Sequence, residues 1–192
     1  MTFIALEGGE GSGKSTQARL LAEALGAVLT HEPGGTEIGA TIRRLVLDPA
    51  TEGLDARAEA LLMLADRAQH VATVIRPALE RGRVVVTDRF SGSTLAYQGY
   101  GRGLDLEALA ATSRWASGGL EPDVVVLLDV AVGRTGGVPD RMESEEDGFH
   151  VRVAEGYRAL AAADPVRWAV VDGSGSVEEV AALVWKAVHE RL

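Results

Sequence analysis

Cysteine is absent from this chain of 192 residues, and long hydrophobic runs are absent as well. Without cysteine the protein has no disulfide bond, thiol nucleophile or thiolate metal site. This composition is typical of a reducing compartment, so we expect a cytoplasmic protein. No stretch approaches the roughly 18 uninterrupted apolar residues that cross a bilayer. No basic region precedes an apolar segment near the first residue, so we expect neither a membrane anchor nor a secretion signal.

Positive charge is also scarce. Lysine and arginine together number 19 against 28 acidic residues, which gives a formal net charge of −9. A protein that binds a nucleic-acid backbone needs a positively charged surface to displace counterions. The sequence therefore favours a small-molecule substrate over a nucleic acid. Lysine occurs only at positions 14 and 186, and Lys14 lies within the most informative segment of the chain.

That segment, residues 8–15, reads Gly-Gly-Glu-Gly-Ser-Gly-Lys-Ser. It stands between an apolar run and an apolar-periodic stretch, which is the strand, loop and helix order of a phosphate loop. Glycines let backbone N–H groups point at a phosphate, Lys14 reaches the outer phosphates, and the Ser15 hydroxyl binds Mg²⁺. We therefore predict a nucleoside triphosphate site with Mg²⁺, formed by Gly8, Gly9, Glu10, Gly11, Ser12, Gly13, Lys14, Ser15 and Thr16.

Short β-branched runs alternate with helical stretches along the whole chain. This alternation predicts an α/β fold, with one domain over residues 1–192 and a doubly wound five-stranded parallel sheet flanked by helices. Ligands of such folds bind at the carboxyl ends of the strands. Pro77 predicts a kink in the third helix. The expected strands are 2–6, 28–31, 83–87, 124–129 and 168–171, and the expected helices are 15–25, 38–47, 54–81, 104–117, 147–163 and 177–191.

The class of triphosphate-binding protein can be narrowed. A guanine-nucleotide switch reads its base with Asn-Lys-x-Asp, which two lysines at positions 14 and 186 cannot form. A large ATPase motor needs more chain and a strand that ends in adjacent acids. Instead, Asp88 and Arg89 follow the predicted strand 83–87, where an acid can hold Mg²⁺-bound water and a cation can bind an anionic acceptor. From this pair alone, an Asp-Arg pair that caps the strand is an equally good interpretation.

Residues 131–146 have the least regular pattern and are rich in glycine, acids and arginine. Long polar loops in compact domains are often functional, so we interpret this segment as a short flexible lid. An ordinary polar loop between a strand and a helix is the alternative interpretation.

Several further motifs occur together in the order and spacing of one family. With them the sequence resembles the bacterial thymidylate kinases, P-loop nucleoside monophosphate kinases, over nearly its whole length. The resemblance implies transfer of the γ-phosphoryl group of ATP to dTMP, giving dTDP and ADP, by a Mg²⁺-dependent homodimer. The motifs are Glu32-Pro33-Gly34-Gly35-Thr36, Asp88-Arg89-Phe90, Ala96-Tyr97-Gln98-Gly99-Tyr100-Gly101-Arg102-Gly103, Pro122-Asp123, Leu128-Asp129-Val130 and Glu155-Gly156-Tyr157.

The resemblance also implies roles for single residues around ATP and the acceptor phosphate. Lys14 and Ser15 would serve the ATP phosphates, with Ser15 and Asp88 at the metal. Arg43 and Arg89 would surround the acceptor phosphate, since arginine suits bidentate contacts. Glu10 is an unexpected residue among phosphate-binding amides. The resemblance implies that it reaches the 3′-hydroxyl of the acceptor sugar or the water bound to it, and an acid that simply points outward is the alternative.

Recognition of the nucleoside falls to a second group of residues. Arg67, Thr94 and Gln98 would read the base, and the Gln98 amide offers both a donor and an acceptor. Tyr97 would lie against the sugar and disfavour a 2′-hydroxyl. Without the resemblance, Thr94 and Gln98 fit a polar helix face better. The complete set expected to contact dTMP is Glu10, Glu32, Pro33, Arg43, Met63, Arg67, Arg89, Thr94, Tyr97 and Gln98.

The sequence departs from the family pattern at two places. Met63 replaces a phenylalanine that often stacks on thymine, which predicts a softer contact through sulfur and methylene groups. The lid is shorter than usual and carries fewer arginines. Arg134 and Arg141 are the candidates to stabilise charge on the transferred phosphoryl group. Asp140-Arg141-Met142-Glu143 matches the family better, so Arg141 is expected to matter at least as much as Arg134.

Two other functions stay open at this point. One is a kinase for a different deoxynucleotide or nucleoside, and the other is a catalytically weak protein that binds or senses nucleotides. A homodimer is also expected, because the third helix offers more apolar surface than one core needs, at Leu61, Leu62, Leu64, Val71 and Val74.

Overall fold

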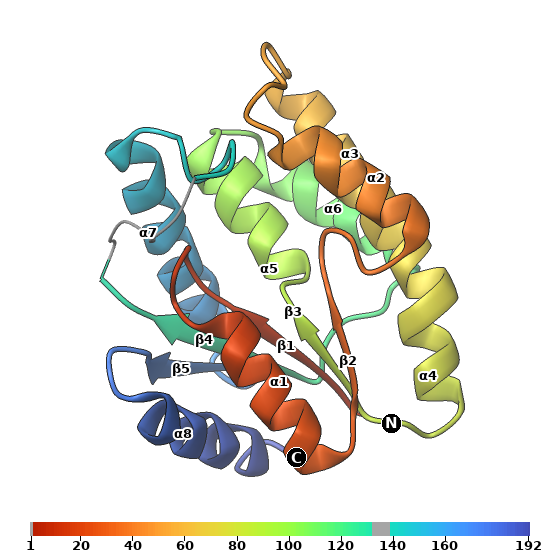
Figure 1. Ribbon diagram of the computed structural model, residues 1–192, viewed down its shortest axis with the longest axis vertical. Coiled ribbons are helices and arrows are strands. Elements are labelled where there is room, and N and C mark those ends of the chain that lie inside the picture. Colours follow the sequence, from red (N-terminus) through yellow and green to blue (C-terminus); the bar gives the residue numbers. More distant parts are fainter. Residues whose placement is uncertain (1, 132–138) are drawn as a thin grey trace.

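The computed structural model describes residues 2–131 and 139–192. Five parallel strands form one sheet in the order β2-β3-β1-β4-β5 (Figure 1). Because the strands are parallel, their carboxyl ends meet at one edge of the sheet. The α/β fold expected from the sequence is confirmed. The strands are β1 (Phe3–Glu7), β2 (Val28–His31), β3 (Val85–Asp88), β4 (Val124–Asp129) and β5 (Trp168–Asp172).

Strand β1 shows why both faces of the sheet are covered. All five of its residues are buried, and successive side chains point to opposite faces. Ile4 and Leu6 pack into a core cluster with residues of α1 (Lys14–Leu25) and α8 (Val177–His189). Phe3 and Ala5 pack on the other face, together with Phe90. A strand buried on both faces is mostly apolar, which is the pattern of residues 3–6, and the buried acid Glu7 ends the strand.

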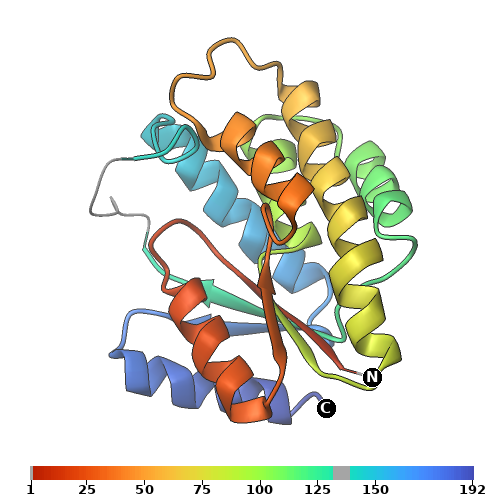
Figure 2. The ribbon, with the colours of Figure 1, turned by 45° about the vertical axis from the view of Figure 1, so that its right-hand side comes forward.

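The helices form two layers around the sheet. Helices α1 and α8 cover one face, and the other helices lie on the opposite side (Figures 1 and 2). Within the described ranges, no helix is long and apolar enough to cross a membrane. The elements of the second layer are α2 (Glu37–Leu47), α3 (Ala56–His70), α4 (Arg76–Glu80), α5 (Ser91–Thr94), α6 (Leu106–Ala116) and α7 (Asp147–Ala163).

The expected helix 54–81 is one long helical segment with a change of winding. A π-helical turn, η1 (Val71–Ile75), joins α3 to α4 immediately before Pro77. Proline lacks an N–H and its ring crowds the preceding turn, which accounts for an interruption of the regular α-helix here.

A further helical segment was not among the expected elements. α5 continues into a π-helical stretch, η2 (Leu95–Gly101), and η2 packs against α7. Three glycines in residues 91–101 give the segment low intrinsic helix propensity. Packing provides the stabilisation instead, because Ala96 and Tyr97 share a buried cluster with Phe149 and Val153 of α7.

Candidate active site

The phosphate loop leaves the sheet at Glu7 and enters α1 at Lys14. Gly8 has a φ of +147°, and a Cβ atom there would stand 2.6 Å from the carbonyl oxygen of Leu128. Gly13 precedes the helix with a φ of +81°. Both positions therefore require glycine, the first because β4 approaches closely and the second because of its left-handed conformation.

Lys14 is buried inside the loop. Its Nζ donates to the carbonyl oxygen of Gly9 at 2.5 Å and to Oγ of Ser12 at 3.2 Å. Burial and the neighbouring charge of Arg89 lower the pKa of Lys14 to about 8. An ammonium group that is held by loop atoms and shielded from water is well placed to accept an anion.

Ser15 and Asp88 bring α1 and the end of β3 together. The Ser15 hydroxyl donates to Oδ2 of Asp88 at 2.5 Å. The other carboxylate oxygen, Oδ1, is buried and has no hydrogen-bond partner among the described residues. A hydroxyl beside a carboxylate with a free buried oxygen is a donor set of the kind that Mg²⁺ takes, together with phosphate oxygens and water. The two residues expected at the metal are therefore neighbours with suitable chemistry.

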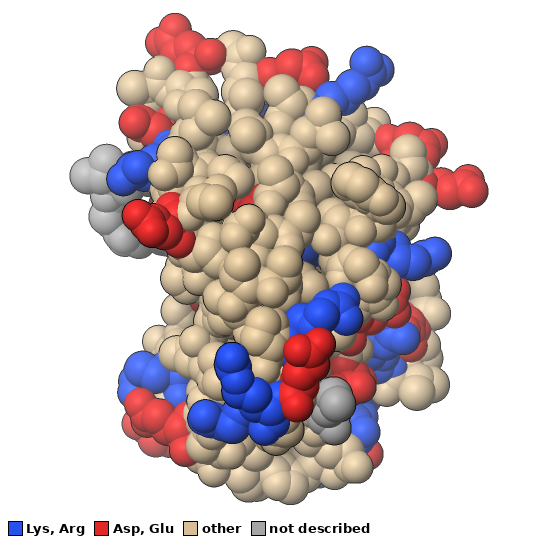
Figure 3. Space-filling model, turned by 90° about the vertical axis from the view of Figure 1, so that its right-hand side faces the viewer, with Lys and Arg blue, Asp and Glu red and all other residues tan. Residues whose placement is uncertain are grey.

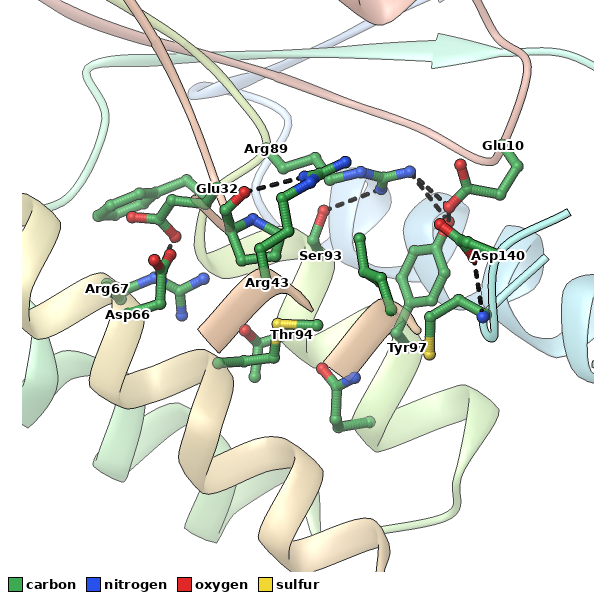
Figure 4. A pocket seen from close by; sticks show the side chains of 16 residues that line it. Glu10, Glu32, Arg43, Asp66, Arg67, Arg89, Ser93, Thr94, Tyr97 and Asp140 are labelled. Atoms are coloured by element: carbon green, nitrogen blue, oxygen red, sulfur yellow. Dashed lines mark hydrogen bonds and ion pairs between the residues drawn. The ribbon is translucent and has the colours of Figure 1, made fainter. Parts of the chain in front are cut away.

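Arg89 is the most extensively bonded side chain of the site. It has a positive φ of 72°, which is unusual for a residue other than glycine. Its Nη2 pairs with Oε1 of Glu10 at 2.7 Å, and its guanidinium lies over the ring of Tyr97, 5.0 Å from the centroid. Figure 4 shows Arg89 reaching across the cavity to Glu10. Backbone strain at such a residue is tolerated because several contacts fix the side chain.

Glu10 does not point outward into solvent. Its carboxylate accepts from Arg89 and, at 2.6 Å, from the Tyr97 hydroxyl. Burial alone would raise its pKa, yet the charges of Arg89 and Lys14 lower the pKa of Glu10 to about 2. The acid in the phosphate loop is thus an ionised carboxylate that helps to hold Arg89 in place.

Two adjoining cavities surround these residues. One follows the phosphate loop from Glu10 to Thr16 and includes Asp88, and we call it the donor cavity. The other, between α3 and η2, is called the acceptor cavity. Residues that line both cavities mark the boundary where two ligands would meet, and they are Glu10, Glu32, Arg43 and Arg89.

All ten residues expected to contact the acceptor nucleotide line the acceptor cavity. Thr94 and Gln98 are buried, so their interpretation as a polar surface face is wrong. Met63 also lines the cavity. Lining residues outside the expected set are Leu47, Asp66, Phe90, Ser93, Asp140 and Met142.

Arg67 is fixed from two sides. Its Nε donates to Oε2 of Glu32 at 2.9 Å, and its Nη1 donates to Oγ of Ser113 at 2.9 Å. The other oxygen of Glu32 lies 2.9 Å from Nδ1 of His70. The arginine therefore enters the cavity in a fixed orientation, which a side chain needs if it is to discriminate between ligands.

Asp66 is a buried acid with an incomplete set of partners. Its Oδ1 accepts from the backbone N–H of Gly34 at 3.1 Å, and its Oδ2 is buried without a partner among the described residues. Burial and the nearby charge of Glu32 raise the pKa of Asp66 to about 6. The hydrogen bond to Gly34 fixes the loop that carries Glu32 and Pro33 into the cavity.

A family model described as thymidylate kinase matches residues 6–184. The chain belongs to the thymidylate kinase family. It is 49% identical to the thymidylate kinase of Solidesulfovibrio magneticus over 208 residues, covering 99% of this chain and all of that one. It is 53% identical to that of Leifsonia xyli subsp. xyli, covering 94% and 90%. A crystal structure of thymidylate kinase from Ehrlichia chaffeensis matches with a TM-score of 0.85 at 32% identity, covering 97% and 98%.

The family membership decides which class of triphosphate-binding protein this is, which the phosphate loop by itself left open. The protein is an ATP-dependent nucleoside monophosphate kinase that phosphorylates dTMP to dTDP. The resemblance, the fold and the activity expected from the sequence are confirmed.

Gln98 uses part of its amide within the protein. Its Nε2 donates to Oε1 of Glu59 at 2.9 Å. The sequence predicted that the amide offers a donor and an acceptor to thymine. The bond to Glu59 takes up one of the amide N–H groups, because a carboxylate beside Gln98 can only accept.

Of the two candidate arginines of the lid, only Arg141 lies among the described residues. Arg141 lies outside the two cavities, with its Nη2 2.5 Å from Oε2 of Glu59 and its Nε donating to the carbonyl oxygen of Val46 at 2.8 Å. Arg134 lies outside the described residues. A role for Arg141 in charge stabilisation therefore requires its ion pair with Glu59 to open.

A buried group beneath Arg89 was missed by sequence reasoning. Glu7 accepts from the backbone N–H of Phe90 at 3.0 Å, from the Ser93 hydroxyl at 2.6 Å and from the Tyr157 hydroxyl at 3.2 Å. Burial raises the pKa of Glu7. Ser93 and Tyr157 in turn each accept from Nη1 of Arg89. An acid that ends an apolar strand immediately before the phosphate loop was the available signal for this group.

Proposed function

We propose that the two cavities bind ATP and dTMP end to end, with phosphoryl transfer at the boundary formed by Glu10 and Arg89. The observation that carries this assignment is the sharing of Glu10, Glu32, Arg43 and Arg89 between the donor and acceptor cavities. Both substrates are anions, so the two arginines at this boundary reduce their repulsion and orient the acceptor phosphate.

On the donor side, Lys14 binds the outer phosphates of ATP, and loop N–H groups from Gly8 to Thr16 hold the phosphate chain. Ser15 and Asp88 hold Mg²⁺, which neutralises phosphate charge when it is bound. Support comes from the short contact between Ser15 and Asp88 and from the free oxygen of Asp88.

On the acceptor side, Arg67, Thr94 and Gln98 read the base, and Met63 packs against it. Tyr97 lies beside the sugar, and its hydroxyl is fixed by Glu10. Glu10 itself faces the sugar hydroxyl. Fixed side chains pay less entropy on binding, which favours selective recognition over loose association.

Catalysis in this arrangement depends on positioning and charge. Phosphoryl transfer needs little covalent help from the protein, and alignment of the two substrates supplies most of the rate. Lys14 and Arg89 act on charge that develops on the transferred group. A lid arginine adds to this, and residues 131–146 exclude water so that ATP is not hydrolysed.

We also propose a cytoplasmic homodimer built from one kinase domain per chain. Figure 3 shows that the middle of the face on the side of α3 and α4 carries few charged side chains. Of the five apolar residues expected to contribute, Leu64 and Val71 belong to the core, whereas Leu61 is 61% exposed. The outward apolar surface of α3 is thus smaller than expected, and sedimentation velocity tests the dimer directly.

The test of the proposed function is a coupled assay of ADP release with ATP, dTMP and Mg²⁺. We expect turnover to require all three. Turnover that is unaffected by a strong Mg²⁺ chelator would contradict the metal site, and ADP release that is independent of dTMP would contradict the end-to-end arrangement.

A further inference from the structure

Glu59 lies directly behind the residue that we assign to base recognition. Gln98 lines the acceptor cavity, and its Nε2 donates to Oε1 of Glu59. Glu59 is completely buried but is not among the described residues that line the cavity. It therefore contacts the Gln98 amide from outside the cavity lining.

Two arginines hold Glu59 in its ionised form. Arg102 donates from Nε to Oε1 at 3.2 Å and from Nη2 to Oε2 at 3.0 Å. Arg141 adds a bond to Oε2 at 2.5 Å. Burial alone would raise the pKa of Glu59, but the hydrogen bonds from Arg102, Gln98 and Arg141 lower it below its ordinary value. An ionised carboxylate has no proton to donate and only accepts hydrogen bonds.

This chemistry determines which way the Gln98 amide is turned. The NH₂ group must face Glu59, so the carbonyl oxygen faces away from it. We propose that Glu59 is a specificity-determining positioning residue, which fixes the Gln98 amide so that its oxygen meets the nucleobase. The inference rests on the proposed role of Gln98 in reading the base.

An oxygen at this position distinguishes two pyrimidines. N3 of thymine carries a hydrogen and donates, whereas N3 of cytosine has a lone pair and accepts. The Gln98 oxygen therefore pairs with thymine and faces an unfavourable lone pair in cytosine. A site built to hydrogen-bond one substrate discriminates strongly against an analogue that leaves its polar groups unpaired.

The substitution Glu59→Gln tests the inference with little change in volume. A glutamine here accepts from the two guanidiniums with its oxygen and turns its NH₂ group toward Gln98, whose amide must then flip. We expect the ratio of kcat/KM for dTMP to kcat/KM for dCMP to fall at least about tenfold, mainly through a higher KM for dTMP. This ratio is measured on one sample, so a loss of folded protein does not change it.

Three further variants test the role of Glu59. Arg102→Gln is the matched control, because Arg141 keeps Glu59 ionised, and the ratio should stay within about twofold of the parent. Glu59→Gln/Arg102→Gln removes the Glu59–Arg102 ion pair as a unit and serves where the single variant folds poorly. Arg141 is then the guanidinium that loses its carboxylate partner, and it keeps its bond to the carbonyl oxygen of Val46. Glu59→Asp keeps a group that can only accept and should preserve the ratio.

The inference is overturned if Glu59→Gln and the double variant both keep the dTMP-to-dCMP ratio of the parent. Gln98→Leu separates this failure from a failure of the proposed function. If Gln98→Leu also keeps the ratio, Gln98 does not read the base. If Gln98→Leu loses the ratio while Glu59→Gln retains it, Gln98 reads the base without being oriented by Glu59.

Discussion

Glu10 and Arg89 form an ion pair of 2.7 Å that joins the phosphate loop to the end of β3. The pair lies at the boundary between the donor and acceptor cavities. The low pKa of Glu10, about 2, keeps the pair ionic at neutral pH. An arginine that is already oriented by a fixed anion needs little rearrangement to bind a phosphate, which is the condition for electrostatic catalysis.

Lys14→Ala is expected to abolish turnover and leave the fold intact. The ammonium is the single cation inside the loop, and its own partners are loop atoms of Gly9 and Ser12 rather than core groups. We expect kcat to fall by about 10³-fold or more, with an unchanged far-ultraviolet circular dichroism spectrum. Near-normal phosphorylation of dTMP would contradict the assignment of the donor cavity.

Gln98→Leu should impair dTMP recognition far more than ATP binding. The substitution nearly preserves volume but deletes the amide that faces the acceptor cavity. Steady-state kinetics with dTMP and dCMP, together with an ATP binding titration, measure the two effects separately. An unchanged preference for dTMP over dCMP would show that another residue reads the base.

Asp66→Asn is expected to change how stability depends on pH. The raised pKa of Asp66, about 6 against 3.8, means that the folded state binds more protons than the unfolded state between these values. Parent stability therefore falls as pH rises from about 4 to 6, and then levels off. The variant lacks this contribution and still accepts from Gly34.

Urea unfolding without nucleotide between about pH 4.5 and 7.5 measures the Asp66→Asn effect. The stability of the variant relative to the parent should increase across this range, by no more than about 3 kcal/mol. A difference that is independent of pH would show that Asp66 does not titrate in this window.

The two lid arginines should respond differently to alanine substitution. Arg141 is bonded to Glu59 and Val46, so Arg141→Ala should lower stability and raise KM for dTMP while reducing the single-turnover rate less than about tenfold. Arg134→Ala should reduce that rate by about 10³-fold, as for other arginines that act on a transferred phosphoryl group. The opposite pattern would show that the Arg141–Glu59 pair opens during catalysis.

Local patterns in the sequence were sufficient for most of the fold. β2 and β4 have the expected bounds, and the phosphate loop stands where its motif placed it, because burial on both faces and glycine spacing leave a strong local signal. Residues 91–101 left no such signal. Their helical conformation depends on packing against α7, and tertiary packing overrides propensity.

The site was predicted through motifs, and its supporting residues were not. Glu59 occupies an apparently exposed acidic position in an amphipathic helix, yet it is buried behind Gln98 because η2 and Arg141 close over it. Ser93 likewise resembles an ordinary polar residue. Contacts between residues 39 to 86 positions apart fix these groups, and periodicity within one segment carries no information about them.

The central claim is that the acceptor cavity is built for the thymine nucleotide and meets ATP at Glu10 and Arg89. The most direct measurement compares kcat/KM for dTMP, dUMP, dCMP, dAMP and dGMP in one coupled assay with ATP and Mg²⁺. We predict the highest value for dTMP, a lower value for dUMP, and much lower values for dCMP and both purine nucleotides. Equal or faster phosphorylation of dCMP or a purine nucleotide would contradict the account.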